Sequence, residues 1–509
     1  MSAPSLFVGG AVSAPLLPLS LLVPLAGLVP LMLLGPCWGR RAALACLALG
    51  CVLAAAIGFE VAGRGAALAD FVGGWAPPLG VALRADGFAC AMLAMSAAVL
   101  FGTGVFAAIP PQADGQPLPR AFFMLLLCLA CALNLAFLAQ DLFTLYVALE
   151  LLTFAAVPLV CLDGKAGQIE AALTYLMFAL FGSVLYLLGA VLVYGLFGTL
   201  DITLVAARAG APGTAPAFIA ALALMSAGLV AKAALFPLYL WLPPAHSGAP
   251  PAASAVLSAV VIKAPLFLLV RLWADLTPAP LADAAAPLLA ACGAGAIVFC
   301  GVLALAQTRL KLLIAYSTAA QIGYLCLMFP LAAGAAVMGD AEWRALAWTG
   351  GTLHLVSHAF SKAAMFLAAG LMAELMGHDR LSGLTGMARR APLSVAAFGL
   401  GGLSLMGLPP AGGFVAKVML LTSALQQQVW WIAVVILLGG LLAGGYVLKV
   451  VVAALQRPDG PLPAAREARG RALVALGLGL VAVALGFVPL APLDVLAIGR
   501  PLSWEGLLP

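Results

Sequence analysis

The chain consists of long apolar stretches separated by short segments that hold most of its charged residues, prolines and glycines. Most stretches reach about 20 residues, the length of an α-helix that crosses a lipid bilayer. Their apolar residues are continuous and do not alternate with polar ones, so the pattern excludes a porin-type β-barrel. It predicts an all-α polytopic membrane protein with fourteen transmembrane helices, at residues 14–35, 42–62, 87–109, 121–139, 142–161, 170–197, 216–237, 252–274, 284–306, 311–330, 346–375, 391–426, 429–455 and 472–497.

Two of the predicted helices contain residues that break helices. The segment 391–426 is too long for one straight span, and Gly407-Leu-Pro-Pro410 lies near its middle. The stretch Phe236–Pro251, at the end of the seventh helix, holds five prolines. Proline removes a helical hydrogen bond and clashes with the preceding turn. We therefore expect helices seven and twelve to be broken, which membranes tolerate only where protein or water satisfies the backbone.

The composition agrees with this pattern. Hydrophobic residues make up 65% of the 509 residues and charged residues 8%, and the mean hydropathy is +1.16. Soluble domains carry about 25% charged residues. The composition therefore excludes a soluble enzyme, a nucleic-acid-binding protein and a disordered scaffold. The first apolar run has no Lys or Arg before it, so Ser5–Gly35 is predicted to be a retained first helix and not a signal peptide.

The positions of Lys and Arg predict the orientation in the membrane. With the N-terminus outside, thirteen of these residues fall in inner loops and six in outer loops, leaving out five lysines within helices. Inner loops of membrane proteins carry the excess of positive charge. We therefore expect a multi-pass protein of a bacterial-type inner membrane with both termini outside.

Five of the seven lysines fall inside predicted helices, namely Lys232, Lys263, Lys362, Lys417 and Lys449. A lysine at the centre of a membrane helix costs about 2.5–3.5 kcal/mol on the insertion scale. A lysine near a helix end can instead extend its side chain to the interface, and Lys449 suits that interpretation. The five together predict a polar pathway through the interior.

A short internal repeat involves the same lysines. The pentapeptide Gly-Leu-Val-Ala-Lys at 228–232 matches Gly-Phe-Val-Ala-Lys at 413–417, an offset of 185 residues. Val-Ile-Lys at 261–263 matches Val-Leu-Lys at 447–449 at an offset of 186. This offset pairs an odd-numbered helix with an even-numbered one, so the two halves would be inverted relative to each other. Inverted repeats with broken helices are typical of transporters.

Glu150 is the candidate intramembrane acid. It follows Asp141 by nine residues, about 13 Å along a helix. A lone buried carboxyl group would be protonated, whereas one beside a lysine stays charged, so we expect Lys232 as its partner. Such a pair forms a switch, because the ammonium keeps its proton near Glu150 and releases it when the two separate. The alternative is a static ion pair that braces two helices.

The predicted eleventh helix carries His354, His358 and Lys362. Steps of four residues place them on one face, about 6 Å apart along the axis, with Ser357 and Ser361 beside them. Histidine suits proton transfer because its charge changes near neutral pH, so the row predicts a proton relay. Two alternatives are hydrogen-bonded packing histidines and a zinc site. The zinc site lacks the glutamate of H-E-x-x-H and a third ligand.

The remaining polar positions are less informative. His246, within the proline-rich stretch, is either a proton entry from the inner side or an ordinary loop histidine. Cys128 and Cys131 form a C-x-x-C without a second pair or a nearby histidine, so we interpret them as buried small hydrophobic residues and not as a zinc site. The sequence contains no phosphate loop, dinucleotide fingerprint or catalytic triad. We expect no metal and no cofactor.

Several of these motifs together resemble a known family, the proton-conducting, antiporter-like membrane subunits. This family includes three large subunits of respiratory complex I, the large subunits of Mrp-type sodium/proton antiporters and relatives in energy-converting hydrogenases. The resemblance covers about residues 70–455. The segments that carry it are Phe143–Glu150, Lys232–His246, Lys311–Thr318, His354–Lys362 and Gly407–Lys417.

The resemblance implies fourteen helices with two inverted five-helix repeats. Helices one to three then occupy residues 1–110, the first repeat with helices four to eight 121–274, and the second with helices nine to thirteen 284–455. Helix fourteen and a short tail occupy 472–509. Broken helices seven and twelve would each carry a lysine of the pump.

The resemblance also implies roles residue by residue. Glu150 matches the helix-five glutamate, Lys232 the helix-seven lysine and Lys263 the helix-eight bridge. The helix-eleven relay and the helix-twelve exit group correspond to His354, His358, Lys362 and Lys417. One complex I subunit has glutamate at this last position, and the most distal one has a long lateral helix that we do not expect here. Mrp-D-like and hydrogenase-type subunits therefore match better.

These observations predict translocation of protons, or exchange of sodium for protons, by a subunit of a larger membrane complex. We expect no covalent chemistry in this chain, although the larger complex could be redox-driven like NADH:quinone oxidoreductase. The expected partners are other membrane subunits, protons, sodium in an antiporter, and lipid. Two other classes stay open at this point: an organic-solute transporter on a similar inverted repeat, and a mainly structural membrane subunit.

Overall fold

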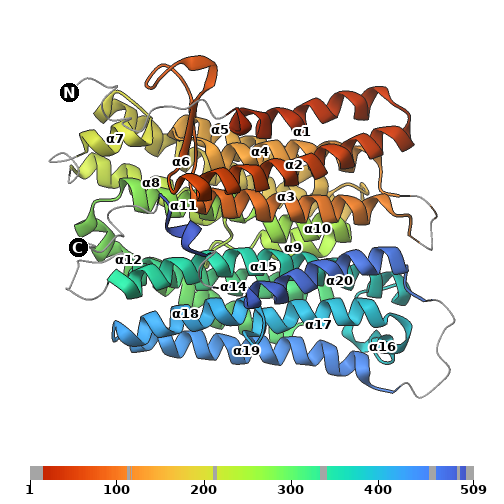
Figure 1. Cartoon of the computed structure of the whole chain (residues 1–509). Coiled ribbons are helices and arrows are strands. Elements are labelled where there is room, and N and C mark those ends of the chain that lie inside the picture. The colour runs from red at the N-terminus through yellow and green to blue at the C-terminus, as the bar shows by residue number, and fades with distance from the viewer. Residues whose placement is uncertain are drawn as a thin grey trace.

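The protein is a bundle of helices that lie roughly parallel to one another (Figure 1). A computed structural model describes residues 15–111, 115, 117–209, 215–332, 341–457, 466–489 and 493–499. Among them, twelve helices are long and apolar enough to cross a membrane. The predicted all-α membrane fold is confirmed, whereas residues 5–14 of the predicted first helix lie outside the described part.

The first third of the chain follows the predicted order of helices. Two strands, β1 (Leu68–Phe71) and β2 (Ala82–Ala85), pair antiparallel between α2 and α3. Asp86 begins α3 by accepting a hydrogen bond from the Ala89 amide, and Asp141 begins α5 in the same way with Thr144. The helices are α1 (Leu16–Leu33), α2 (Pro36–Arg64), α3 (Gly87–Ala108), α4 (Arg120–Leu138), α5 (Leu142–Val160) and α6 (Ala166–Phe197).

The middle of the chain contains the first expected break. After the short α7 (Ile202–Arg208), α8 (Pro216–Lys232) ends five residues before the predicted end of helix seven. A non-helical segment leads to the short α9 (Leu242–Gly248). The next span runs from Pro251 to Leu276 as α10 (Pro251–Val256), a π-helical turn (Leu257–Val261), α11 (Lys263–Arg271) and a second π-helical turn (Leu272–Leu276).

The last part of the chain contains the second break, at residues 407–411 between α17 and α18. The predicted fourteenth helix is shorter than expected, because α20 ends at Ala484 and a 3-10 turn follows at Leu485–Phe487. The elements are α12 (Ala279–Gly295), a π-helical turn (Ala296–Cys300), α13 (Gly301–Ala306), α14 (Leu310–Ala332), α15 (Ala341–Met376), α16 (Met387–Arg390), α17 (Pro392–Met406), α18 (Gly412–Gln426), α19 (Trp430–Leu455) and α20 (Arg469–Ala484).

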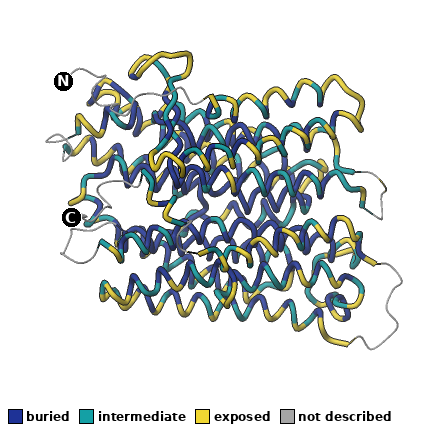
Figure 2. Tube along the Cα trace, viewed as in Figure 1, coloured by how far each residue is buried: buried dark blue, intermediate teal, exposed yellow. Residues whose placement is uncertain are grey.

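The most buried helices form the centre of the bundle. In Figure 2 the dark blue segments lie inside and the yellow ones along the outer rows. The apolar windows of Pro251–Leu276, α15 and α14 are 100%, 94% and 89% buried, whereas those of α1 and α2 are only 28% buried. Because lipid solvates the outer helices, their apolar side chains need no protein cover. Polar side chains on these three central spans are therefore shielded from lipid by the surrounding helices.

Close packing of α6 on α8 depends on two glycines. A methyl group added to Gly228 would collide with the carbonyl oxygen of Gly182, and one added to Gly182 would lie 2.6 Å from the carbonyl oxygen of Gly228. Small residues let helix backbones approach in this way. The contact places Ser183 on α6 next to Lys232, the last residue of α8.

The two matching pentapeptides lie differently relative to the helix breaks. Lys232 is the last residue of α8, before the first break, whereas Lys417 lies in α18, after the second break. The sequence match therefore does not place the two lysines at corresponding points of their broken helices.

Candidate functional site

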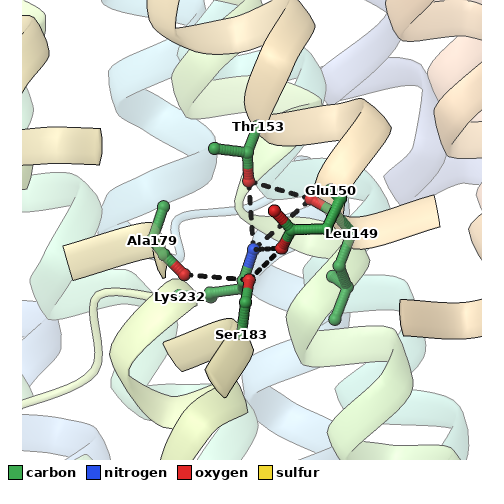
Figure 3. A network of polar contacts seen from close by, with 6 residues as sticks. All are labelled: Leu149, Glu150, Thr153, Ala179, Ser183 and Lys232. Atoms are coloured by element: carbon green, nitrogen blue, oxygen red, sulfur yellow. Dashed lines mark hydrogen bonds and ion pairs between the residues drawn. The ribbon is translucent and has the colours of Figure 1, made fainter. Parts of the chain in front are cut away.

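The ion pair of Glu150 and Lys232 connects α5 with the end of α8 (Figure 3). The Lys232 Nζ lies 3.4 Å from Glu150 Oε1 and also donates to Thr153 Oγ1 at 3.0 Å and to the Leu149 carbonyl at 3.3 Å. The Ser183 hydroxyl donates to the same carboxylate oxygen. The structure thus brings together the two groups that the sequence analysis paired.

A small cavity of about 10 Å³ lies next to this pair. Its lining includes Lys232 and Thr153, together with Val261 and Pro265. These last two residues flank Lys263. A space of about 10–15 Å³ is the smallest that holds one water molecule. One water there would fill the space between Lys232 and the helix that carries the next lysine.

Lys263 is completely buried at the start of α11. Its Nζ donates to the backbone carbonyl of Ser258 at 2.6 Å. Ser258 belongs to the π-helical turn Leu257–Val261, and such single turns are frequent at functional sites because they shift a helix by one residue. The turn therefore supplies a backbone acceptor for the buried ammonium group.

His354, His358 and Lys362 are all buried along α15. The two imidazole rings are 6.1 Å apart and nearly parallel, with 12° between their planes. His354 Nε2 lies 3.2 Å from the Gln321 carbonyl, whereas His354 Nδ1 and His358 Nε2 have no hydrogen-bond partner among the described residues. Lys362 Nζ donates to Ser317 Oγ at 2.5 Å. The predicted row is thus internal, with ring nitrogens open to a further partner.

Lys417 lies in α18 and points to the second break. Its Nζ donates to the Leu405 carbonyl at 2.6 Å and lies 4.2 Å from the centre of the Tyr324 ring. A cation over an aromatic face is stabilised by the ring electrons. The ammonium group is therefore held by a carbonyl and an aromatic face.

Lys263, Lys362 and Lys417 share one electrostatic property. In the described part of the chain, no carboxylate oxygen lies within 4.0 Å of their ammonium nitrogens, and their hydrogen bonds go to carbonyl and hydroxyl oxygens. Ionisable side chains held in this way within a membrane typically mark ion pathways.

His246, which the sequence analysis gave as a proton entry or an ordinary loop histidine, lies in the short helix α9 and not in a loop. Its ring is fully buried and stacks on Phe366 at 5.1 Å, and neither ring nitrogen has a partner within the described ranges. The next residue, Ser247, lines a cavity of about 830 Å³ that has several charged residues in its wall. The ionisable residues that also line it are four Lys or Arg, one His and three acidic residues, namely Lys165, Arg309, Lys311, Arg471, His378, Asp163, Glu374 and Asp379.

Lys449 does not join the other four lysines of the predicted pathway. It is exposed on α19, and its Nζ donates at 2.9 Å to the carbonyls of Leu305 and Gln307 at the end of α13. A lysine near a helix end can hydrogen-bond the last carbonyls of a neighbouring helix. The exposure of Lys449 thus agrees with its interpretation as a lysine near a helix end, apart from the four buried lysines.

A second buried ion pair lies apart from these residues. Arg271 at the end of α11 bonds to Asp86, whose side chain is 1% exposed, at the start of α3. Asp275 and Arg84 extend the cluster at 3.9 Å. In the described ranges no three His, Cys, Asp or Glu side chains gather as a metal site would need. The cluster thus joins helices by charge pairing.

Several polar residues around the lysines were not singled out from the sequence. Thr153 and Ser183 contact the Glu150–Lys232 pair, and Ser317 contacts Lys362. In the sequence, only their spacing could have pointed to them: Thr153 follows Leu149 by four residues, and Ser317 precedes Gln321 by four. Such spacing places each pair on one helix face. Serine and threonine are too common in membrane helices for this spacing to identify a site.

Comparison with known proteins identifies the family. The model of a family described as "NADH:quinone oxidoreductase/Mrp antiporter, TM" matches residues 139–443. The chain belongs to this family. Two of its relatives are NADH-quinone oxidoreductase subunit N of Desulforudis audaxviator, 36% identical over 385 residues, and a Na(+)/H(+) antiporter subunit of Alkalihalophilus pseudofirmus, 28% identical over 354 residues. These alignments cover 75% and 69% of this chain and 73% and 68% of the relatives.

Solved structures of this family share the fold. A chain in the Mrp complex from Dietzia sp. superimposes with a TM-score of 0.85 at 25% identity, covering 94% of this chain and 95% of that one. A chain of respiratory complex I from Thermus thermophilus with bound aureothin gives a TM-score of 0.72 at 25% identity, with 94% and 98% covered. The resemblance noted from the motifs is therefore confirmed.

Proposed function

We propose that this chain moves protons across the membrane, or exchanges sodium for protons, as one membrane subunit of a larger ion-translocating complex. The observation that carries the proposal is the line of buried ionisable groups through the central helices, where three lysines hydrogen-bond to carbonyl and hydroxyl oxygens. The relatives support it, because their names describe subunits of NADH-quinone oxidoreductase and of a Na(+)/H(+) antiporter.

In the proposed route, protons reach the relay from the 830 Å³ cavity next to His246, or through Lys263. They load Lys232 and pass along the relay of α15 to Lys417, the proposed exit group. They leave outward when a motion of a partner subunit separates Glu150 from Lys232. In an antiporter the direction reverses, and sodium uses part of the path. The cavity beside Lys232 is only about 10 Å³, which suits water and not an organic solute.

The proposed orientation has both termini outside. Four basic residues of the predicted inner loops, Lys165, Arg309, Lys311 and Arg471, line the same cavity, which supports their common side. Arg84 and Arg271 from the predicted outer side both lie at Asp86. An alkaline phosphatase fused to the C-terminus should be active, because its disulfides form only outside the cytoplasm. An inactive fusion at normal expression would show that the C-terminus lies inside and would contradict the proposed orientation.

The proposed division of the chain has two inverted units, at 121–274 and 284–455, between helices at 1–110 and 472–509. Each unit contains one broken helix, at 233–241 and 407–411, which supports the division. An experimental structure tests it by superposition of the two units after rotation about an axis in the membrane plane. The division fails if their five helices do not overlay.

The proposed function is tested by removing single ammonium groups from the assembled complex. Lys362→Met and Lys417→Met keep an apolar chain of similar length, and each should lower proton translocation into inverted membrane vesicles by about tenfold or more. Lys449→Leu is the matched control, because that lysine is exposed, and it should translocate at the normal rate. Wild-type translocation by both variants in normally assembled complexes would overturn the proposal.

A further inference from the structure

Helix α8 ends at Lys232 in a defined hydrogen-bonding pattern. The Val230 carbonyl accepts from the Leu235 amide at 3.1 Å. The Ala231 carbonyl accepts from the Ala234 amide at 3.3 Å. These two bonds form a Schellman motif, in which the residue that follows the cap adopts a left-handed conformation and is usually glycine. In α8 that residue is Ala234.

Ala234 has a backbone conformation that its side chain disfavours. Its φ is 54°, in the left-handed region, where Cβ crowds the backbone. At the second break the same two types of bond end α17, and the residue in this position is Gly407, with a φ of 77°. Gln428 is the other described non-glycine residue with a positive φ, and it is exposed. The buried end of α8 is therefore strained at Ala234.

The residues that follow Lys232 favour a longer helix. Residues 233–235 are Ala-Ala-Leu, and alanine and leucine are among the strongest helix formers. Pro237 lies five residues beyond Lys232 and would permit another turn. In a continued helix, the Ala231 carbonyl would accept from the Leu235 amide, four residues on. Because the local sequence favours continuation, a tertiary contact must end α8 at Lys232.

Trp241, on the far side of the break, makes this contact. Its indole Nε1 donates to the Ala231 carbonyl at 3.0 Å. The indole stacks on the Tyr175 ring of α6, with ring centres 4.3 Å apart and 8° between the planes. Both side chains are buried. A carbonyl oxygen has two lone pairs, and the indole and the Ala234 amide occupy both. The acceptor that a continued helix would use is therefore taken.

The contact lies next to the Glu150–Lys232 pair. Ala231, which accepts from the indole, directly precedes Lys232 in the last turn of α8. Tyr175 lines the 10 Å³ cavity together with Lys232. From this turn the Lys232 ammonium reaches Glu150 at 3.4 Å and Thr153 at 3.0 Å (Figure 3). Contacts that fix the turn therefore fix the position of the ammonium group.

We propose that Trp241 is a positioning residue for Lys232: it ends α8 at this lysine and so keeps the ammonium group beside Glu150. The inference rests on the proposed function and adds a residue to it. Trp241 takes up and releases no proton. It favours the arrangement in which Lys232 is paired over one in which α8 continues. Separation of the pair then costs one hydrogen bond, and relief of the strain at Ala234 favours it.

Trp241→Phe in the assembled complex tests the proposal, because it removes the indole N–H and keeps an aromatic ring beside Tyr175. The net contribution of one hydrogen bond changes an equilibrium by roughly fivefold. Proton translocation into inverted membrane vesicles should therefore fall by about fivefold, with the amount of assembled complex unchanged. Trp273→Phe is the matched control, because the Trp273 indole also donates to α8, to Ser226 Oγ at 3.0 Å, six residues before Lys232. It should translocate normally.

A second substitution separates positioning from packing. Glycine adopts the left-handed conformation without strain, so Ala234→Gly favours the same end of α8 that the indole favours. Added to Trp241→Phe, it should restore most of the translocation rate. Ala233→Gly is the control for this restoration, because Ala233 has a φ of −77° and glycine there relieves no strain. Added to Trp241→Phe, it should restore nothing.

Normal translocation by Trp241→Phe, while Lys417→Met is slow, would overturn this inference and leave the proposed function intact. A loss in Trp241→Phe that Ala234→Gly does not restore, or that Ala233→Gly restores equally well, would also overturn it, because the loss would then come from packing of the indole. A Trp273→Phe variant as slow as Trp241→Phe would do the same, since any indole on α8 would then matter equally.

Discussion

The Glu150–Lys232 pair either works as a proton switch or only braces α5 against α8, and a double-mutant cycle distinguishes the two. The variants are Glu150→Gln, Lys232→Met and their combination. Both substitutions keep the approximate size of the side chain and remove its charge. The pair is well suited to this test because Lys232 is 5% and Glu150 16% exposed at the side chain.

The magnitude follows from the distance of 3.4 Å between Nζ and Oε1. At an effective dielectric constant of about 20, two unit charges at this distance attract by about 5 kcal/mol. Removing one partner of a buried pair typically costs about 3–5 kcal/mol, because the other charge remains buried alone. Replacing both is often close to neutral. The double variant should therefore lose several kcal/mol less than the sum of the single variants.

The free energy of unfolding is measured on the purified full-length chain by denaturant titration in detergent micelles, and transport on the assembled complex in vesicles. A brace predicts that the double variant regains both stability and transport. A switch predicts that it regains stability alone, because no ammonium group remains to carry the proton. Wild-type transport by the double variant would refute the switch.

The ion pair of Arg271 with Asp86 is the matched control. It is equally buried and lies outside the proposed relay. Arg271→Met should cost about as much stability as Lys232→Met, about 3–5 kcal/mol. Transport per assembled complex should nevertheless stay normal. This result would show that a loss of stability does not by itself reduce transport.

Two further predictions concern stability. Burial, followed by the nearby charge of Asp141, raises the pKa of the Asp201 carboxyl above its usual value. Asp201→Asn keeps the cap on the Leu204 amide and should stabilise the fold by about 1 kcal/mol at pH 7. This gain in stability should shrink as the pH falls through the raised pKa of Asp201, because the wild-type carboxyl is then protonated. Thermal unfolding at several pH values measures it. A gain that persists at low pH would contradict the reasoning. Gly228→Ala should cost about 1–3 kcal/mol by overpacking against α6, whereas Gly195→Ala, with nothing within 4 Å, should be neutral in the same assay.

The positions of the helices were largely predictable from the sequence. Each predicted span contains a helix, because about 20 continuous apolar residues have few other structures open to them in lipid. The two breaks were predictable from their prolines. The end of α8 at Lys232 was not, since the apolar run continues to Pro237 and only the folded backbone shows where helical hydrogen bonding stops.

The site was predictable where rare residues mark it. An acid and several lysines within apolar runs are unusual in a membrane helix. Their presence there identified Glu150 and Lys232 as candidate partners from the sequence alone. The position of Lys449 was less predictable, because a run of apolar residues does not tell which side of a helix faces protein. The hydroxyl groups that contact the lysines, such as that of Ser317, gave no signal, since their contacts depend on helices that are distant in sequence.

The helix breaks also place carbonyl groups beside lysines where carboxylates are scarce. A helix ends in carbonyl groups without partners, equivalent to roughly half a negative charge. Lys417 binds the Leu405 carbonyl at the end of α17, and Lys449 binds carbonyls at the end of α13. Interrupted backbone thus supplies fixed partial anions that no proton can neutralise. Unlike an acidic side chain, such a counter-charge stays constant throughout a transport cycle.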